Sequence, residues 1–242
     1  MVEELLAAAH ERLHGLAVER VVIGLAYTAV LLSDGSLGLA ATPHEGGCHT
    51  HPAAGELSGR AASDLAAGLL SPDPLSSTLG LATVNAVLGD CAQKSPDPIE
   101  VLGIEPESVV GVVGYIDPLI RDLRTRAREV IVFERNLARP GVLPDWAVET
   151  ELPRCDVVFI TGTAFANKTI GRLVELSQGR VAVIGPSTPL WAGLLTRGID
   201  ALFGARARNP EGVLRTVAEG GGTRALFRHG LEKVALWREK PM

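Results

Sequence analysis

Aromatic residues are scarce in this sequence: Phe, Trp and Tyr together make up 4% of its 242 residues. Hydrophobic residues still account for 46% of the chain, which is an ordinary share for a globular protein. The core must therefore be built mostly from Ala, Val, Leu and Ile. The length allows one large domain or two modest ones, since domains commonly have about 100–150 residues.

Cysteine is also scarce, and basic charge is not in excess. Cys48, Cys91 and Cys155 are odd in number and lack Cys-x-x-Cys spacing. Neither a disulfide framework nor a zinc ribbon is predicted, and reduced thiols are expected. The net charge of −5 and the isoelectric point near 5.7 argue against a nucleic-acid partner, because such proteins need a basic surface.

The chain begins without the pattern of a secretion signal. Its first residues, MVEELLAAAHERLHGL, carry acidic residues and a helical stripe in place of a basic region and an apolar run. No stretch of the sequence is long and apolar enough to cross a bilayer. We therefore expect a cytoplasmic protein without a membrane partner.

The first part of the sequence predicts a mixture of helices and strands. An amphipathic helix over residues 2–16 is followed by a β-rich segment over 20–34 and by the run LGLAAT. The turn Ser33–Ser36 between the two apolar runs predicts a β-hairpin. A loop over residues 42–55 leads to two predicted helices, over 57–70 and 76–89, and the second is apolar nearly all round.

The second part predicts a different architecture. Residues 89–107 are polar and rich in proline, which indicates a boundary between a domain over 1–90 and a domain over 106–242. Beyond it, the short β-branched runs VVGVVG, EVIVF, DVVFI and RVAVIG alternate with helical segments. Unbroken apolar runs are typical of strands that are covered on both faces. The pattern predicts a Rossmann-like, doubly wound parallel sheet.

Polar loops follow each of the four predicted strands, and ligands of such sheets bind at the carboxyl ends of the strands. The candidate ligand-binding residues in these loops are Asp117, Glu134, Thr161, Gly162, Thr163, Asn167, Gly185, Pro186 and Ser187. The dinucleotide motif Gly-x-Gly-x-x-Gly is absent. Asp117 also fits as a helix cap, and either Asn167 or Thr169 fits as the cap of the helix that follows the third strand. Glu134 fits equally as a ribose ligand or as a surface ion-pair partner.

The predicted first domain holds two further candidates. Asn85 lies in the apolar helix LATVNAVL, where a buried amide needs partners from the core or from a cleft between the domains. The loop around His44, Cys48, His49 and His51 places four donors for a divalent metal within eight residues. Its spacing matches no standard zinc motif, so a merely solvated loop is the alternative.

The motifs GLAYTAV, GLATVNA, FERN, ITGTAFANKT and IGPSTP occur in this order along nearly the whole chain. As a set they resemble a family of bacterial and archaeal proteins described as putative heavy-metal chelation. The resemblance implies an enolase N-terminal-like α+β domain followed by a Rossmann-like domain, with a site where the two meet. Carried over to this sequence, that site comprises Asn85, Glu134, Thr161–Thr163, Asn167 and Gly185–Ser187, without the His/Cys loop.

Three functions remain open from the sequence. The first is a protein, enzymatic or not, that binds a small ligand or metal chelate in the cleft between the domains. The second is a transferase that depends on a nucleotide or S-adenosylmethionine, which Glu134 favours and the missing glycine motif disfavours. The third is non-catalytic metal sequestration by the His44–His51 loop. A divalent heavy metal ion is the one cofactor indicated, and homo-oligomerisation is left open.

Overall fold

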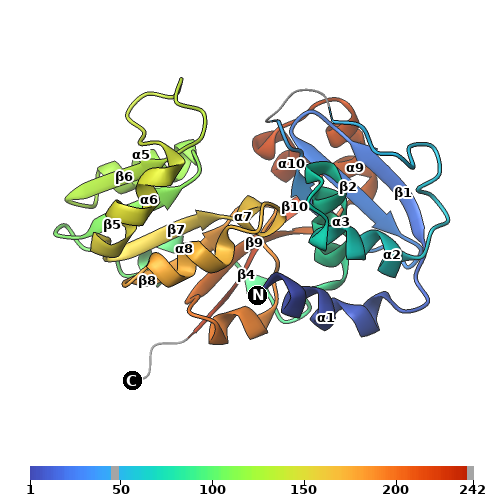
Figure 1. The fold of residues 1–242 in the computed structure, drawn as a ribbon, viewed down its shortest axis with the longest axis horizontal. Helices are drawn as coiled ribbons and strands as arrows, with labels where there is room; N and C mark the ends of the chain where they lie inside the picture. Colours follow the sequence, from blue (N-terminus) through green and yellow to red (C-terminus); the bar gives the residue numbers. More distant parts are fainter. Residues whose placement is uncertain (45–48, 239–242) are drawn as a thin grey trace.

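The computed structural model describes residues 1–44 and 49–238, which form two lobes (Figure 1). One lobe contains a three-stranded sheet in the order β1-β2-β3, and the other contains a seven-stranded sheet. Within these residues, no helix combines the length and the apolar character that crossing a membrane requires.

The three-stranded sheet is antiparallel throughout. It follows the first helix, and the elements are α1 (Val2–Leu13), β1 (Val18–Ile23), β2 (Tyr27–Leu32) and β3 (Leu37–Ala41). The predicted hairpin of β2 and β3 is present, with Tyr27 opposite Ala41. The β-rich segment predicted over 20–34 is two strands rather than one, because the chain reverses at Gly24, whose N–H donates to Tyr27 O at 2.9 Å.

The helices of this lobe differ from the prediction at their starts. They are α2 (Ala62–Ala67), the 3₁₀ turn η1 (Gly68–Leu70) and α3 (Pro74–Val87). The helix predicted over 57–70 begins later, because Arg60 O is used by Val18 N–H beside β1. The helix predicted over 76–89 begins two residues earlier, because Asp73 caps it by accepting from Ser76 N–H at 2.7 Å.

The seven-stranded sheet has the order β4-β10-β9-β8-β7-β5-β6. Its strands are β4 (Gln93–Lys94), β5 (Val109–Val113), β6 (Glu129–Phe133), β7 (Val157–Thr161), β8 (Arg180–Ile184), β9 (Ala201–Ala207) and β10 (Leu231–Trp237). The five strands from β5 to β9 are parallel to one another, and β10 pairs antiparallel with both of its neighbours, β9 and β4. The predicted α/β class, with an α+β part before a mostly parallel sheet, is confirmed. The likeness of the first part to an enolase N-terminal domain stays a prediction.

Helices cover both faces of this sheet, as expected of a doubly wound fold. Between the strands lie α4 (Pro98–Val101), α5 (Asp117–Arg124), η2 (Asp145–Ala147), α6 (Val148–Glu151), η3 (Leu152–Arg154), α7 (Thr163–Ala166), α8 (Ile170–Leu176) and η4 (Ala192–Thr196). Neighbouring strand residues point to opposite faces. Val112 of β5 packs with Ile120 of α5, whereas Val158 of β7 belongs to the core that includes Leu173 of α8.

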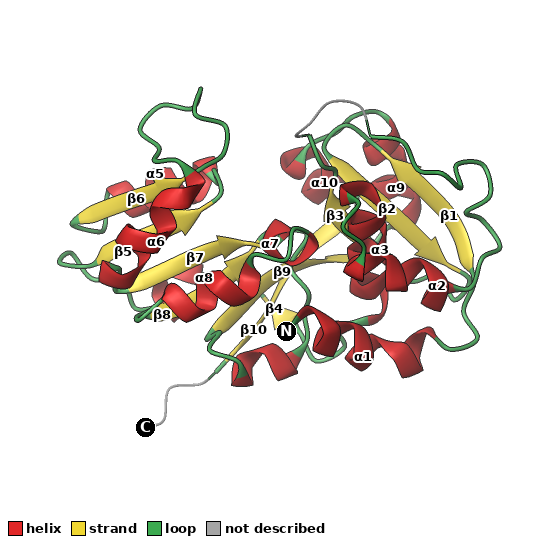
Figure 2. Ribbon diagram, viewed as in Figure 1, coloured by secondary structure: helices red, strands yellow, loops and turns green. Residues whose placement is uncertain are grey.

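The last two helices return to the first lobe (Figure 2). They are α9 (Pro210–Ala218) and α10 (Thr223–His229). Val213 and Val217 of α9 and Leu226 of α10 form one buried cluster with Ala29 and Leu31 of β2. The first sheet therefore lies between α3 on one face and α9 and α10 on the other, an arrangement that the sequence did not predict.

The predicted boundary over residues 89–107 contains two short elements of its own. β4 pairs with β10 through Val234 and Ala235, and α4 packs into the core of the second sheet through Ile99. The Arg206 guanidinium donates to Gly89 O and Ala92 O, at 2.8 Å each. The segment is therefore fixed to the second sheet, and the division into domains at 1–90 and 106–242 stays a prediction.

Candidate functional site

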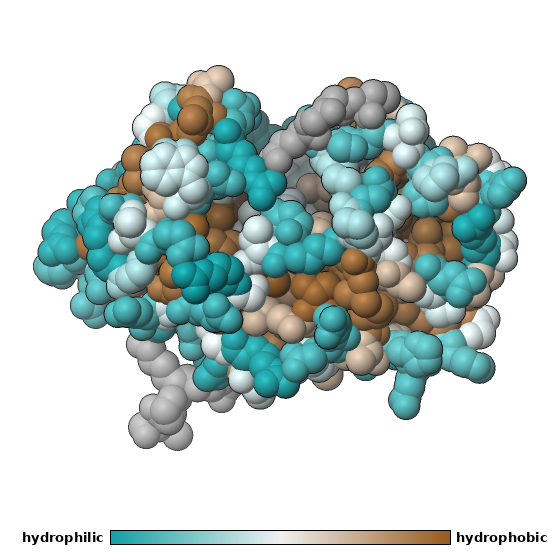
Figure 3. All heavy atoms as spheres, in the orientation of Figure 1, coloured by the Kyte–Doolittle hydropathy of each residue, from teal (hydrophilic) through white to brown (hydrophobic). Residues whose placement is uncertain are grey.

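The order of the parallel strands reverses between β5 and β7. From β5 the chain crosses to β6 on one side and then returns past β5 to β7, β8 and β9 on the other. A reversal of this kind leaves a crevice at the carboxyl ends of the two central strands. We call the loops that leave β5, β6, β7 and β8 on this side the carboxyl edge. Figure 3 shows a notch between the two lobes, on the side to which these strands point.

The loops of the carboxyl edge approach one another closely through glycine. A Cβ atom at Gly114, after β5, would lie 3.0 Å from the Thr161 Cβ at the end of β7. A Cβ at Gly162 would lie 2.5 Å from Thr188 N and 2.6 Å from Ser187 C, far closer than atoms can approach. These two glycines bring three consecutive loops of the sheet into contact, as the predicted site requires.

Glu134 joins the loops after β5 and β6. One carboxylate oxygen accepts from Tyr115 N–H at 2.9 Å, and the other accepts from Asn136 N–H at 3.1 Å. The Arg139 guanidinium lies 5.0 Å from the centre of the Tyr115 ring, within the range of a cation–π contact. Glu134 therefore fixes two loops that bring an aromatic ring and a cation together. Tyr115 and Arg139 were not predicted as site residues.

The β7 and β8 exits carry the predicted hydroxyl groups. Thr161 Oγ1 accepts from Thr163 N–H at 3.4 Å and lies 3.2 Å from Thr163 Oγ1. Ser187 Oγ accepts from Ala41 N–H at 2.8 Å, which ties the exit of β8 to the end of β3 in the other lobe. Pro186 and Gly185 belong to the same turn, and Gly185 has a left-handed φ of 119°.

Asn85 reaches this region across the boundary between the lobes. Its Nδ2 donates to Leu39 O at 2.8 Å and to Ser187 O at 3.2 Å. The amide thus connects α3, β3 and the β8 exit. The structure brings Asn85, Glu134, Thr161, Gly162, Thr163 and Ser187 into one chain of contacts along the carboxyl edge.

Two predicted residues make local contacts within or beside their own helices. The N-cap of α5 is Ile116 rather than Asp117, so the capping role considered for Asp117 is wrong. Asp117 is the first helical residue and pairs instead with Arg121 one turn on, at 3.1 Å. Asn167 Oδ1 accepts from Thr169 N–H and Thr169 Oγ1, at 3.1 and 2.7 Å, just before α8 begins.

Lys168, which the sequence did not single out, connects the β7–α8 loop to the first lobe. Its Nζ donates to Ser71 O, Ser77 Oγ and Ala166 O at 2.5, 2.6 and 2.9 Å. Within residues 1–44 and 49–238 it is the one non-glycine residue with a positive φ, 62°. Partial burial lowers the pKa of its ammonium group, and the nearby Asp73 carboxylate opposes that shift. No sequence motif identified this contact.

The predicted metal loop lies in the first lobe, where the Asp73 carboxylate is near both Lys168 and the imidazoles of His49 and His51. Cys48 is outside the described residues, and His44 is exposed. His49 and His51 line a separate cavity of about 400 Å³ beside Val21 and Ile23 of β1. His51 Nδ1 accepts from Ala53 N–H at 3.2 Å, so the proton of the neutral ring lies on Nε2. The part of the chain that the structure describes gathers no group of three or more His, Cys, Asp or Glu suited to a metal ion.

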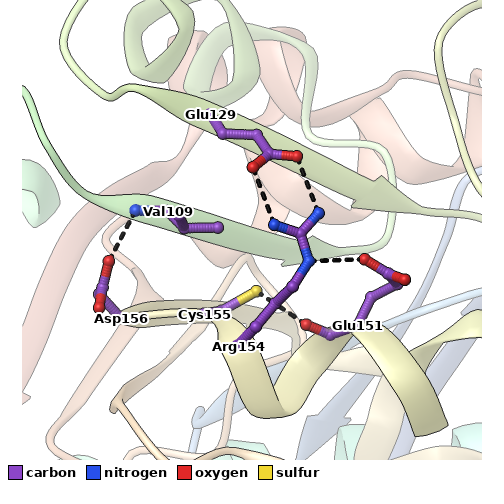
Figure 4. Close-up of polar contacts among 6 residues, drawn as sticks. All are labelled: Val109, Glu129, Glu151, Arg154, Cys155 and Asp156. Carbon is purple, nitrogen blue, oxygen red and sulfur yellow. Dashed lines mark hydrogen bonds and ion pairs between the residues drawn. The ribbon is translucent and has the colours of Figure 1, made fainter.

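The opposite edge of the sheet carries a network of charged side chains at its surface (Figure 4). Arg154 donates to both oxygens of Glu129 at 2.8 Å and to Glu151 at 2.7 Å. Asp156 accepts from Val109 N–H at 2.8 Å. Burial raises the pKa of the neighbouring Cys155 thiol to about 11. These charged groups lie at the amino ends of β5, β6 and β7, whereas ligands of such sheets bind at the carboxyl ends.

Family comparison agrees with the resemblance stated above. Residues 97–236 match a family model described as putative heavy-metal chelation, and residues 6–88 match a second model with the same description. An uncharacterised protein of Methanocaldococcus jannaschii is 30% identical over 124 residues, which cover 48% of this chain and 48% of that protein. The match thus spans about half the length of that relative.

Two solved structures share the whole fold. A protein of unknown function from Desulfitobacterium hafniense is 24% identical, with a TM-score of 0.83 over 98% of this chain and 100% of that one. A protein of unknown function from Pyrococcus horikoshii is 21% identical, with a TM-score of 0.85 over 98% of this chain and 99% of that one. At these identities the likeness establishes the fold alone.

Proposed function

The chain belongs to the family described as putative heavy-metal chelation, and we propose that it binds a small metal chelate at the carboxyl edge, between β5 and β7. The observation that carries this proposal is the reversal of strand order between these two strands. Ligands of open parallel sheets bind at such reversals across many unrelated functions.

The groups at this edge suit a ligand rich in oxygen. Thr161 and Thr163 offer hydroxyl groups, which donate and accept hydrogen bonds. Arg139, held over Tyr115, adds a positive charge on the neighbouring loop. A carboxylate-rich chelator would find hydrogen-bond donors and a cation here.

The chelated form is favoured over a bare ion by the available donors. Heavy divalent ions prefer thiolate and imidazole ligands, whereas the carboxyl edge offers mainly neutral hydroxyl and amide groups. The described residues do not assemble a three-donor set of His, Cys, Asp or Glu. The bare ion therefore does not fit these residues, and in a chelate the small molecule supplies the ligands of the metal.

Calorimetric titration of tag-free protein tests this proposal, with Zn²⁺ alone, citrate alone and the Zn²⁺–citrate complex as the probes. We expect the complex to bind more tightly than either component. Thr163→Val should weaken its binding by about fivefold, since a hydrogen bond contributes about 1 kcal/mol. Thr196→Val is the matched control, because Thr196 is exposed and its hydroxyl donates to Gly193 O within its own turn. Equal affinity of Thr163→Val and the unmodified protein for the complex would contradict the proposal.

The transferase alternative rests on Glu134, which directly follows β6, the second parallel strand along the chain. Nucleotide-binding Rossmann domains hold a ribose with an acidic residue at this place. Against it, both oxygens of Glu134 already accept backbone N–H groups. ATP and S-adenosylmethionine therefore belong in the same titration. Saturable binding of either one, lost in Glu134→Gln, would favour the transferase over the chelate-binding protein.

A further inference from the structure

A small cavity lies between the two lobes, behind the carboxyl edge. Its volume is about 10 Å³, and Leu39, Leu190 and Leu231 form much of its wall. Asn85 and Thr188 also line it. This volume is about the space that one water molecule needs.

Two polar atoms are buried in this wall without a hydrogen-bond partner among the described residues, Asn85 Oδ1 and Thr188 Oγ1. Thr188 as a whole is 3% exposed. Buried polar atoms in folded proteins are almost always paired, with protein or with ordered water. Two such atoms at one cavity of this size therefore point to a shared partner.

We propose that this cavity binds one ordered water molecule, which bridges Asn85 Oδ1 and Thr188 Oγ1. The water would donate one hydrogen bond to the amide oxygen, which can only accept. It would form a second hydrogen bond with the hydroxyl, which can either donate or accept. Among the described residues that line the cavity none is charged, and two side-chain oxygens are too few to coordinate a cation. A neutral molecule the size of water is the ligand that fits.

The bridging water completes the hydrogen bonds of Asn85. Asn85 Nδ2 donates its two N–H groups to Leu39 O and Ser187 O. The water donates to Oδ1, the oxygen of the same amide. Asn85 is then a positioning residue that holds α3, β3 and the β8 exit together through one amide. This inference does not depend on what binds at the carboxyl edge, because Asn85 Oδ1 and Thr188 Oγ1 are themselves buried.

The sign of the stability change in Thr188→Val tests the inference. If the hydroxyl holds a water, valine removes one of its partners, and Tm should fall by about 2–4 °C. If the hydroxyl has no partner, its removal eliminates the free-energy cost of burying an unpaired polar group, and Tm should stay equal or rise. Thr83→Val is the matched control, because Thr83 is fully buried and its hydroxyl bonds to Leu79 O within α3; its fall in Tm should be smaller.

A high-resolution crystal structure of the unmodified protein gives an independent test of the bridging water. Electron density for a water within hydrogen-bond distance of both atoms, lost in Thr188→Val, is the expected result. An equal or higher Tm of Thr188→Val, or a direct bond between Asn85 and Thr188 without density between them, would overturn the inference.

Discussion

At the carboxyl edge single side chains fix the positions of whole loops, and Glu134 does so with one carboxylate. Its oxygens accept from the backbone amides of Tyr115 and Asn136, so the loops after β5 and β6 share a single acceptor group. Bonds to a charged acceptor are stronger than bonds between neutral groups. The residue is therefore needed for the shape of the edge, whichever ligand binds there.

Replacing Glu134 by Gln should lower Tm by about 2–4 °C. The amide keeps the size of the side chain but offers one acceptor to two N–H donors, so one donor faces an NH₂ group. A loss of about 1 kcal/mol is expected, which corresponds to this shift for a protein of this size. Glu107→Gln, at an exposed position, is the control for scanning calorimetry. The same Tm in both variants would show that Glu134 does not brace the loops.

The two cysteines that the structure describes should differ in reactivity. Cys91 is exposed and Cys155 is buried, and burial raises the pKa of the Cys155 thiol to about 11. Because the raised pKa keeps the thiol protonated, the folded state is favoured below the ordinary thiol pKa of about 8.5, and this contribution is lost as pH rises toward 11.

Iodoacetamide at pH 8 should therefore label Cys91 and leave Cys155 unmodified, since the thiolate is the reactive form. Peptide mapping by mass spectrometry assigns each site separately. Labelling in urea, where both thiols are accessible, is the control. Comparable labelling of the two residues in the native protein would contradict the buried environment of Cys155.

At the scale of elements, the contact between the β7 and β8 exits depends on Gly162. A Cβ at this position would meet the backbone of Thr188 at 2.5 Å, and backbone atoms cannot rotate away. Gly162→Ala should lower stability by about 2 kcal/mol and Tm by about 4–8 °C. Gly171→Ala in α8 is the matched control, because its Cβ would meet nothing within 4 Å.

The Tm of the control variant Gly171→Ala should shift in the opposite direction. Alanine at position 171 of α8 should raise Tm slightly, since Gly within a helix costs about 0.5–1 kcal/mol relative to Ala. Thermal unfolding of the two variants beside the unmodified protein gives both values. A fall in Tm for Gly171→Ala equal to that for Gly162→Ala would mean that the close approach at Gly162 is not the cause.

The strands could be predicted because their signals are local. The apolar runs that form β5, β6, β7 and β8 are each bounded by polar residues, and parallel strands end on one side of a sheet. Because these strand ends share one side, the sequence also predicted that most candidate residues of the carboxyl edge lie near one another. Gly24, by contrast, lies within an apolar run, so nothing in the pattern separated β1 from β2.

The interactions that the sequence did not predict are those between distant segments. Lys168 bonds to Ser71 and Ser77 from the other lobe, and no spacing rule connects residues so far apart. The packing of α9 and α10 on the first sheet has the same origin, because an amphipathic helix shows its apolar face but not the sheet on which it packs. The capping role considered for Asp117 was wrong because Asp also fits the first turn of a helix.

At the scale of the whole molecule, the two lobes share buried surface. One apolar core contains Leu5 and Leu79 of the first lobe together with Ile160 and Val183 of the seven-stranded sheet. The amides and hydroxyls that link Asn85, Ser187 and Ala41 lie across the same boundary. A ligand site between the lobes would therefore have walls that belong to one continuous core, and this core keeps the two walls at a fixed position relative to each other.

Cutting the chain between the predicted domains should leave the lobes together. α9 and α10 follow the cut but cover the first sheet, so separation would expose apolar faces on both fragments. A site for a sequence-specific protease, inserted at the exposed turn over residues 105–107, allows a single cut. After cleavage, both fragments should elute as one species in size-exclusion chromatography and separate only in denaturant. The uncut protein with the same insertion is the control, and two folded fragments that elute apart in buffer would show that the lobes are independent domains.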